Sequence, residues 1–305
     1  MSYELNSSKP RTLNQSGQVV ILLLLVMLTA LTVGLTITQR SLTDVSISSK
    51  SEQSSRAFSA AEAGIEQALE QCANLPACPS NLAQSLNNQS NATVAITGSL
   101  PQANQALEYP PIGRDTSAHF WLVDPNNGFP PASGLSGFTV YFGDPNLDYT
   151  IANNKKPAIE VNVVTYTATP PSYKSNRCFF DSDSTRTGGA SPNGFTAVSC
   201  NGTATIANSS MGANSQFYCS TPITTAACGN YAGVPILTRV RFLYITSNHK
   251  IAVNPTGGSL PTQATLITST GFAGQTQKTI QVFKQTQVIP AFFDYAIFSN
   301  TKIDK

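Results

Sequence analysis

The chain is poor in charge. Only 11% of its 305 residues are Asp, Glu, Lys or Arg, against roughly 25% in an ordinary soluble domain, and the formal net charge is +2. No run of basic residues forms the stripe that neutralises phosphates, so no nucleic-acid partner is predicted. Ser, Thr, Asn and Gln carry most of the polarity. Because 41% of the residues are hydrophobic, the chain can bury a core, which argues against wholesale disorder.

Catalytic and metal-binding motifs are also lacking. The sequence has two histidines, His119 in an expected half-buried strand and His249 in an expected turn. Neither has a ligand partner three or four residues away, and no G-x-S-x-G elbow, Walker A loop or dinucleotide-binding motif occurs. The sequence therefore predicts a protein that is not an enzyme and holds no metal or cofactor. A catalytic triad assembled across the fold stays open.

One short stretch, from Asp181 to Thr185, has the alternating oxygens of a calcium loop. It departs from the EF-hand pattern, because Arg186 stands where glycine is needed and Pro192 where the terminal glutamate is needed. A polar surface loop is the favoured interpretation. A weak calcium site of another type at Asp181 and Asp183 is the alternative.

The strongest positive feature is an uncharged apolar run at residues 19–37. A helix of this length spans about 28 Å, close to the ~30 Å hydrocarbon core of a bilayer. Lys9 and Arg11 precede the run, so the positive-inside rule keeps a leader at residues 1–17 cytoplasmic and sends the body outside. A cleaved secretory signal is the alternative, but its apolar region is shorter and no A-x-A site follows this run.

The helix is expected to continue beyond the membrane, over residues 18–71 in all. Residues 38–71 contain no proline and a single glycine, Gly64. An apolar stripe at helical spacing runs along them, on Phe58, Ala61, Ile65, Ala68 and Leu69. The resulting rod would be roughly 80 Å long. It is expected to end near Cys72, since Pro76 opposes its continuing.

The N-terminal region resembles a known family. A polar leader with basic residues, ending in Ser16-Gly17 and followed by a spanning run, is similar to the class III signal of type IV pilins and pseudopilins. In that family prepilin peptidase cuts after the glycine and the new N-terminus is methylated, which implies cleavage between Gly17 and Gln18. The AFSAAEA segment at residues 57–63 resembles the AFxAAEA helix segment of PilX-type minor pilins. The resemblance covers residues 9–71.

Departures from the family pattern indicate the kind of subunit. Major pilins usually carry a glutamate as the fifth mature residue, where this chain has Leu22, and begin with phenylalanine, where it has Gln18. A carboxylate in the bilayer is costly unless paired, so in pilins it marks a contact with the N-terminal amine of an adjacent subunit. Leu22 cannot make that contact. The resemblance therefore implies a minor subunit of the PilX or GspK type, at the filament tip or in priming of assembly.

The implied partners are other pilin subunits through the N-terminal helix, the cytoplasmic membrane and prepilin peptidase. The implied location is a single-pass protein of the cytoplasmic membrane with its C-terminal domain outside, extracellular after assembly. One alternative is an unprocessed signal anchor that holds a surface adhesin and never polymerises, for which Leu22 is simply lipid-facing. An anchored enzyme is the other.

Beyond the helix, an exported domain at residues 72–305 changes to strand periodicity. Strands are expected at residues 137–142, 158–169, 195–199, 236–246, 263–269, 276–287 and 292–298. A GFAG stretch at 271–274 predicts a hairpin turn, though not the tight two-residue kind. The predicted fold class is α+β, with an antiparallel sheet packed on the exported half of the helix. The aromatic segment 290–298 is expected to dock as a final strand, or alternatively to contact a neighbouring subunit.

Six cysteines lie beyond the expected membrane span: Cys72, Cys78, Cys178, Cys200, Cys219 and Cys228. An even number in an exported domain predicts disulfides. Zinc is the alternative, but no C-x₂-C pair occurs and neither histidine is near a cysteine in sequence. Many connectivities are possible. The simplest has three local bridges, Cys72–Cys78, Cys178–Cys200 and Cys219–Cys228, of which the last two would tie a loop-rich insert at residues 177–230.

Overall fold

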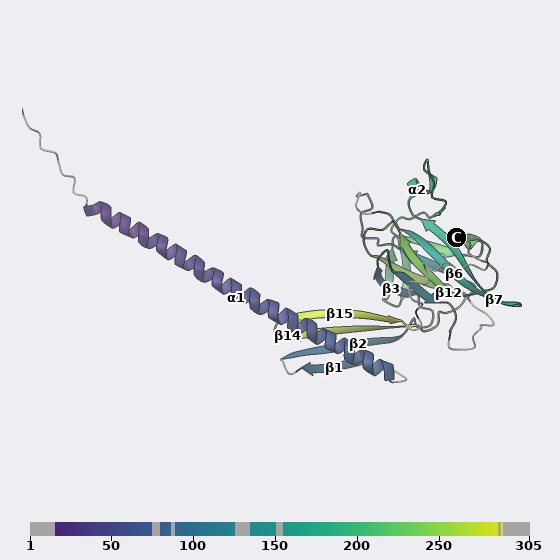
Figure 1. Cartoon of the computed structure of the whole chain (residues 1–305), viewed down its shortest axis with the longest axis horizontal. Coiled ribbons are helices and arrows are strands. Elements are labelled where there is room, and N and C mark those ends of the chain that lie inside the picture. Colours follow the sequence, from purple (N-terminus) through teal and green to yellow (C-terminus); the bar gives the residue numbers. More distant parts are fainter. Residues whose placement is uncertain are drawn as a thin grey trace, which may run out of the picture.

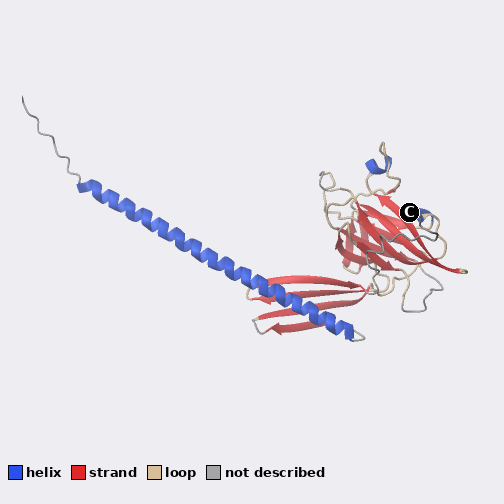
Figure 2. Ribbon diagram, in the orientation of Figure 1, coloured by secondary structure: helices blue, strands red, loops and turns tan. Residues whose placement is uncertain are grey.

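The protein is a long helical rod with a two-part β body at one end (Figure 1). The computed structural model describes residues 16–74, 80–86, 89–125, 135–150, 155–285 and 288. A small sheet lies along the C-terminal part of the rod, and a larger set of sheets lies beyond it (Figure 2). This arrangement confirms the predicted α+β fold, with a long N-terminal helix packed on antiparallel β-structure.

Helix α1, Ser16–Asn74, is one unbroken helix of 59 residues, about 88 Å long. Its threonines do not interrupt it, because their hydroxyls donate to carbonyls one turn earlier, as from Thr36 Oγ1 to Thr32 O at 2.6 Å. The helix extends to both sides of the range predicted. It includes the last two residues of the expected leader and ends at Asn74, which confirms the predicted end near Cys72.

The small sheet, here called the helix-bound sheet, covers the C-terminal third of α1. Its strands are β1 Asn81–Leu86, β2 Ser90–Leu100, β14 Ala264–Ala273 and β15 Thr276–Gln285, in the order β1-β2-β14-β15 and antiparallel throughout. The helix buries small side chains against it: Ala57, Ala60, Ala61, Ile65 and Ala68. Phe58, predicted for the buried stripe, is 46% exposed, because the contact face is centred on the alanines beside it.

The body is an insertion in the helix-bound sheet. The chain leaves that sheet at Leu100 and returns to it at Gln263, whose backbone N–H donates to Leu100 O at 2.8 Å. All strands from β3 to β13 lie between these two residues. Exit and return points are therefore adjacent, as they would be in a hairpin with the body in place of its turn.

Two sheets form most of the body. One has the order β11-β5-β13-β3, from β3 Leu107–Ile112, β5 Gly137–Phe142, β11 Cys219–Ile223 and β13 His249–Thr256. The other, here called the five-stranded sheet, has the order β4-β12-β6-β7-β8, from β4 Ser117–Trp121, β6 Ala158–Ala168, β7 Pro171–Asp181, β8 Thr196–Ala197 and β12 Val234–Leu243. The shared core includes Phe120, Phe138, Phe142, Phe180, Phe242 and Ile251.

Smaller elements complete the body. The hairpin of β9 Ala204–Ser209 and β10 Gly212–Phe217 buries Ile206 and Phe217 against Ala106 and Ala252. Helices α2 Ser184–Gly188 and η1 Ala226–Cys228 are short. The region 177–230 was predicted to be a loop-rich insert, and this is wrong. It contains the end of β7 and all of β8 to β11, and its Ile206 and Phe217 are buried in a cluster shared with Ala106 and Ala252.

Four strand predictions are confirmed with small shifts of their ends, since β5, β6, β12 and β15 lie where periodicity placed them. The prediction at 263–269 is too short, because β14 continues to Ala273, and that at 195–199 reduces to the two-residue β8. Residues 292–298 lie outside the described residues. His249 was placed in a turn but begins β13 and is 1% exposed, because its ring packs beside Phe242.

The turn prediction at GFAG is wrong in type. Ala273 pairs with Thr276, so a tight two-residue turn joins β14 and β15. Gly274 takes φ +58° in this turn, a left-handed conformation that glycine adopts without a steric penalty. Gly271 and Phe272, expected in the turn, are instead strand residues.

The predicted pairing of four cysteines is also wrong. Cys178 is bonded to Cys228, and Cys200 to Cys219, so that the second bridge is nested within the first. The reason is tertiary: η1 lies against β7, which brings Cys228 beside the core-facing Cys178. Cys72 is disulfide-bonded as well, while its predicted partner Cys78 lies outside the described residues. The prediction of disulfides in place of zinc ligands is confirmed for these two pairs.

Candidate functional site

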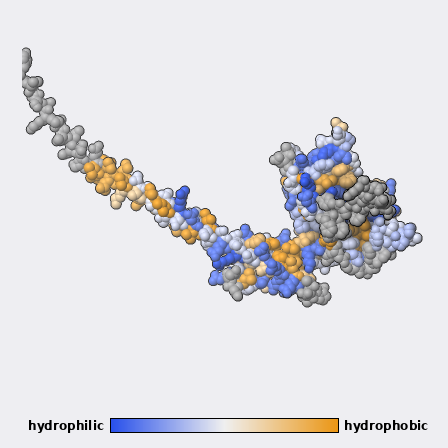
Figure 3. Space-filling model, viewed as in Figure 1, coloured by the Kyte–Doolittle hydropathy of each residue, from blue (hydrophilic) through white to orange (hydrophobic). Residues whose placement is uncertain are grey.

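The first candidate site is the bare part of α1. Large apolar side chains between Val19 and Ile37 are 55–71% exposed, and they form the apolar surface near the far end of the rod (Figure 3). Among the described residues this is the one helix long and apolar enough to cross a membrane. A surface of this length is unfavourable in water and favourable in hydrocarbon. The helix is therefore suited to anchor the chain in a bilayer.

The predicted processing residues lie at the start of this helix. Gly17 and Gln18 belong to the first turn of α1. Leu22 follows one turn later and is 65% exposed among other apolar side chains. The absence of a carboxylate at Leu22 removes a charged contact within the span. Cleavage after Gly17 stays a prediction.

The apolar surface continues past the membrane-length segment. Leu42, Val45 and Ile47 are 60–68% exposed, and the first buried helix residue that faces the helix-bound sheet is Ala57. This part of α1, from Leu42 to Ile47, is called the neck. Its apolar side chains are not covered by the body. Leu42 and Val45, three residues apart, lie on one side of the helix, and Ile47 lies on another.

The contact between helix and sheet is unusually close. A Cβ added at Gly271 would overlap the carbonyl of Ala57 and lie 2.6 Å from the N atom of Ala61. A Cβ at Gly64 would lie 2.5 Å from Ser269 Oγ. The alanines of the AFSAAEA segment are therefore the residues that let the helix backbone approach the sheet. After this segment, the interface between α1 and the sheet is filled by Ile65, Val94 and Ile267.

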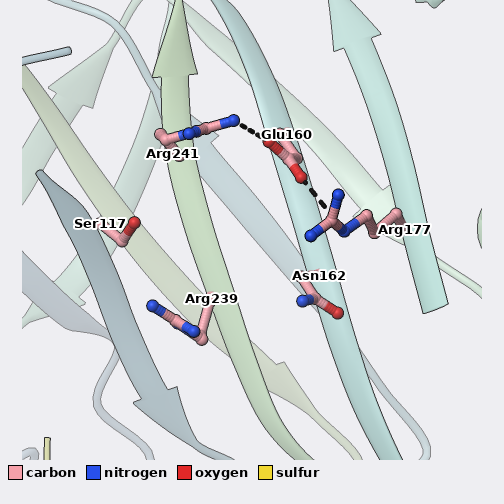
Figure 4. Close-up of a pocket in the computed structure, with 6 residues that line it drawn as sticks. All are labelled: Ser117, Glu160, Asn162, Arg177, Arg239 and Arg241. Carbon is pink, nitrogen blue, oxygen red and sulfur yellow. Dashed lines mark hydrogen bonds and ion pairs between the residues drawn. The ribbon is translucent and has the colours of Figure 1, made fainter. Parts of the chain in front are cut away.

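The second candidate site is a cluster of charged residues on the five-stranded sheet, on the face that points away from the core (Figure 4). Glu160 on β6 accepts from Arg241 Nη2 at 2.6 Å, and its other oxygen lies 3.5 Å from Arg177 Nε. Strand register places Asn162 opposite both Arg239 and Arg177. Glu160 therefore pairs with two guanidinium groups, and Arg239 lies beside them in the lining of the same cavity.

This arginine cluster has a net positive charge and little free space. Its lining residues are Ser117, Glu160, Asn162, Arg177, Arg239 and Arg241. The cavity between them is about 10 Å³, which is room for one water molecule. It cannot enclose an organic substrate, whose pockets are of the order of 300–1,000 Å³. Its chemistry is that of carboxylate recognition by guanidinium groups.

Sequence reasoning did not find the arginine cluster. A signal was present, because Arg239 and Arg241 alternate with the core residues Val240 and Phe242 along β12. Alternation predicts that both arginines share the outer face. The pairing of Arg241 with Glu160 depends on the register between β12 and β6, which the sequence does not state.

The stretch considered as a calcium loop is occupied by an arginine. Arg186 donates to the Asp181 carboxylate from Nε at 2.8 Å and from Nη2 at 2.6 Å, and to Asp183 from Nη1 at 3.1 Å. Asn193 Nδ2 donates to Asp181 as well, at 2.8 Å. The guanidinium stands where a cation would stand, and it also lies 4.7 Å above the ring of Tyr244.

The electrostatics of this loop follow from the same contacts. Burial alone would raise the pKa of Asp183, but hydrogen bonds from Thr185 and the charges of Arg186 and Lys156 outweigh it and hold that pKa below its usual range. Asp183 also caps α2, accepting from Thr185 N. The loop is a structural ion-pair network. Among the described residues, no group of three or more His, Cys, Asp or Glu side chains could hold a metal ion.

The two histidines lie in separate buried places. His119 lies on β4, as predicted, and is 4% exposed. His249 Nδ1 accepts from the backbone N–H of Asp144 at 3.2 Å. Burial lowers the pKa of His249, with the charge of Asp144 opposing, so the neutral imidazole is favoured. His249 Nδ1 also lies 3.5 Å from the hydroxyl of Tyr149, and the imidazole ring packs beside the rings of Tyr149 and Phe242.

Comparison with known proteins gives no relative: no protein-family model, no curated protein and no solved structure matches this chain.

Proposed function

We propose that the chain is a minor subunit of a type IV pilus-like filament, placed at or near its tip or in the priming of assembly. One observation carries the proposal: a single helix joins a bare apolar half to a half that is buried on a four-stranded sheet. Such a helix can move from the bilayer into a bundle of similar helices without refolding, since lipid and partner helices meet the same apolar surface.

Two further features support the proposal. The AFSAAEA segment, which carries the resemblance to PilX-type subunits, is also the segment that makes the closest helix–sheet contact, through Ala57 and Ala61. The leader ends in Gly17 directly before the span, with Lys9 and Arg11 ahead of it. In this proposal residues 1–17 stay in the cytoplasm and are removed by prepilin peptidase, Gln18 becomes the methylated N-terminus, and the body lies outside.

The inserted body would then be the part that meets the exterior. It occupies one loop of the helix-bound sheet and leaves both the span and the neck of α1 uncovered. With Leu22 in place of the glutamate, the subunit lacks the carboxylate through which a major pilin repeats. A subunit used once, at an end of the filament, does not need that contact.

The proposal is tested by the mass of the mature chain. In a host with prepilin peptidase, the wild type is expected to lose residues 1–17 and to begin with a methylated Gln18, whereas Gly17→Ala keeps its leader. Intact-mass spectrometry of the membrane fraction measures both. Wild-type protein that retains its leader, or is cut beyond residue 37, would contradict the proposal.

A membrane-anchored adhesin that does not polymerise is the second candidate. Leu22 favours it, because an anchor needs no charged residue within the span. The same mass measurement separates the two, since a plain anchor keeps residues 1–17 in both proteins.

A further inference from the structure

His249 is buried with one ring nitrogen in a hydrogen bond and the other without one. It begins β13, an inner strand of the sheet β11-β5-β13-β3, and is 1% exposed. Its Nδ1 accepts from the backbone N–H of Asp144 at 3.2 Å, so the neutral ring carries its proton on Nε2. Nε2 is buried and has no hydrogen-bond partner in the part of the chain that the structure describes. The surroundings of the ring therefore suit its neutral form.

The N–H that His249 accepts belongs to a loop after β5, here called the 144–149 loop, whose middle is exposed. The other end of this loop is Tyr149, whose hydroxyl lies 3.5 Å from His249 Nδ1 and donates to Asp144 O at 2.8 Å. The Tyr149 ring is stacked at 17° to the imidazole and packs on the ring of Tyr218, with 4.2 Å between the centroids. Burial raises the pKa of both tyrosines, so neither supplies a charge. The imidazole thus contacts both ends of the loop.

No carboxylate is hydrogen-bonded to this imidazole among the described residues. The two acids of the loop have other partners. Asp144 Oδ1 accepts from Asn146 N at 2.9 Å, and Asp148 Oδ1 accepts from Thr150 N at 2.9 Å. Burial lowers the pKa of His249, and the charge of Asp144 only partly opposes this. Neighbours of His249 on β12, β3 and β13 are uncharged or cationic: Phe242, Ile112 and Lys250.

Protonation of His249 is incompatible with these contacts. A proton on Nδ1 would face the N–H of Asp144, and two donors cannot share a hydrogen bond. The Tyr149 hydroxyl could accept in place of Nδ1 after moving closer than 3.5 Å, which would displace that end of the loop. A charged ring that stays buried without an acceptor is costly. The charged ring therefore gains water when the loop moves away.

We propose that His249 is a proton-operated latch, in which the neutral ring holds the 144–149 loop on the body and the protonated ring releases it. Because the closed state binds the proton less tightly than the open state, acid favours the open state. An exposed histidine has a pKa of about 6.5, so release is expected as the pH falls below this value. The latch acts whether or not the chain polymerises, so its test is independent of the filament proposal.

Amide hydrogen exchange of the full-length chain in detergent micelles tests the latch. Exchange is followed by mass spectrometry at about pH 7.5 and about pH 5, on the two sides of the ordinary histidine pKa, and each rate is divided by the intrinsic rate at that pH. The protection of peptides covering 143–149 is expected to fall about tenfold or more at the lower pH, since each pH unit below the pKa of the open state multiplies opening by up to ten. Peptides from β6 and β12 are expected to keep their protection.

His249→Asn removes the titration and keeps an acceptor, since the amide oxygen of Asn can take the place of Nδ1. In this variant the loop is expected to show equal protection at both pH values. The matched control is His119→Asn, which removes the other histidine, on β4, and is expected to retain the pH dependence. A pH dependence that persists in His249→Asn, or is missing in the wild type, would overturn the proposal. An equal loss of protection in β6 and β12 would also overturn it, because the whole body would then be unfolding.

A second measurement needs no variant. Exchange of the imidazole C2 hydrogen, followed by mass spectrometry for each histidine separately, gives the titration of His249 in the wild type. Its midpoint is expected to coincide with the midpoint of loop opening. Opening of the loop at a pH where His249 is still neutral would contradict the latch.

Discussion

Small residues set the distance between α1 and its sheet. Gly271 faces the helix, and its Cα lies so near the backbone that an added Cβ would overlap Ala57 O. Gly64 plays the same part on the helix side, opposite Ser269. In a close-packed interface a single methyl group has no room unless the backbone moves. The small side chains of the AFSAAEA segment thus have two effects. They are buried at the interface, and they leave room for the helix backbone to approach the sheet.

A substitution at Gly271 tests this close contact. Gly271→Ala is expected to lower the free energy of unfolding by about 1–3 kcal/mol, because helix and sheet must separate to admit the new methyl. Gly98→Ala in the neighbouring strand β2 is the matched control, since a Cβ there meets no atom within 4 Å. Its effect is expected to stay within about 0.5 kcal/mol. Urea unfolding of both variants in micelles gives the comparison, and equal effects would show that the contact is not close-packed.

At the scale of elements, periodicity predicted some strands and missed others, among them β2, although buried and exposed residues alternate along it. Phe138, Val140 and Phe142 mark β5 correctly. Strands β1 and β10 read NLAQSL and GANSQF, whose polar residues gave no signal, and they form because β2 and β9 pair with them. The span of α1 was predictable from composition alone. The arginine cluster was not, because Glu160 meets Arg241 only through the register of β6 and β12.

The pairing of the cysteines could not be predicted either, because it depends on which elements meet in the fold. The bridge Cys178–Cys228 closes 50 residues and Cys200–Cys219 closes 19. In the loop-entropy model these contribute about 4 and about 3 kcal/mol. Replacing Cys178 and Cys228 by Ser is therefore expected to destabilise the body more than replacing the inner pair. Unfolding of the two double variants measures this, and non-reduced peptide mapping checks the connectivity. A crosslinked peptide joining Cys178 to Cys200 would contradict the nested arrangement.

At the scale of the whole molecule, the chain consists of a rod module and a body inserted in it. The rod module is α1 with the helix-bound sheet, and its own core contains Ile65, Val94 and Ile267. The body adds no strand to this sheet. Contacts between the two parts are made by Leu266 and Phe283, which pack against the body's core, and by Gln263 and Gln285. The division places the apolar, membrane-length segment in one part and most of the β-structure in the other.

If the division is real, the rod module folds without the body. Leu100 pairs with Ala264, so residues 101–263 can be replaced by a three-residue loop that ends in glycine, a common hairpin connection. The shortened chain is expected to keep its helix content by circular dichroism and slow amide exchange in β2 and β14, with some loss of stability because Leu266 and Phe283 become exposed.

Ile267→Asp in the shortened chain is the control, since Ile267 is 0% exposed and a carboxylate there disrupts the core. If β2 and β14 exchange as fast in the shortened chain as in this control, the body is required for the rod module to fold. Slow exchange would instead mean that the rod module folds independently, so that the body can change in sequence without disturbing the helix and its sheet.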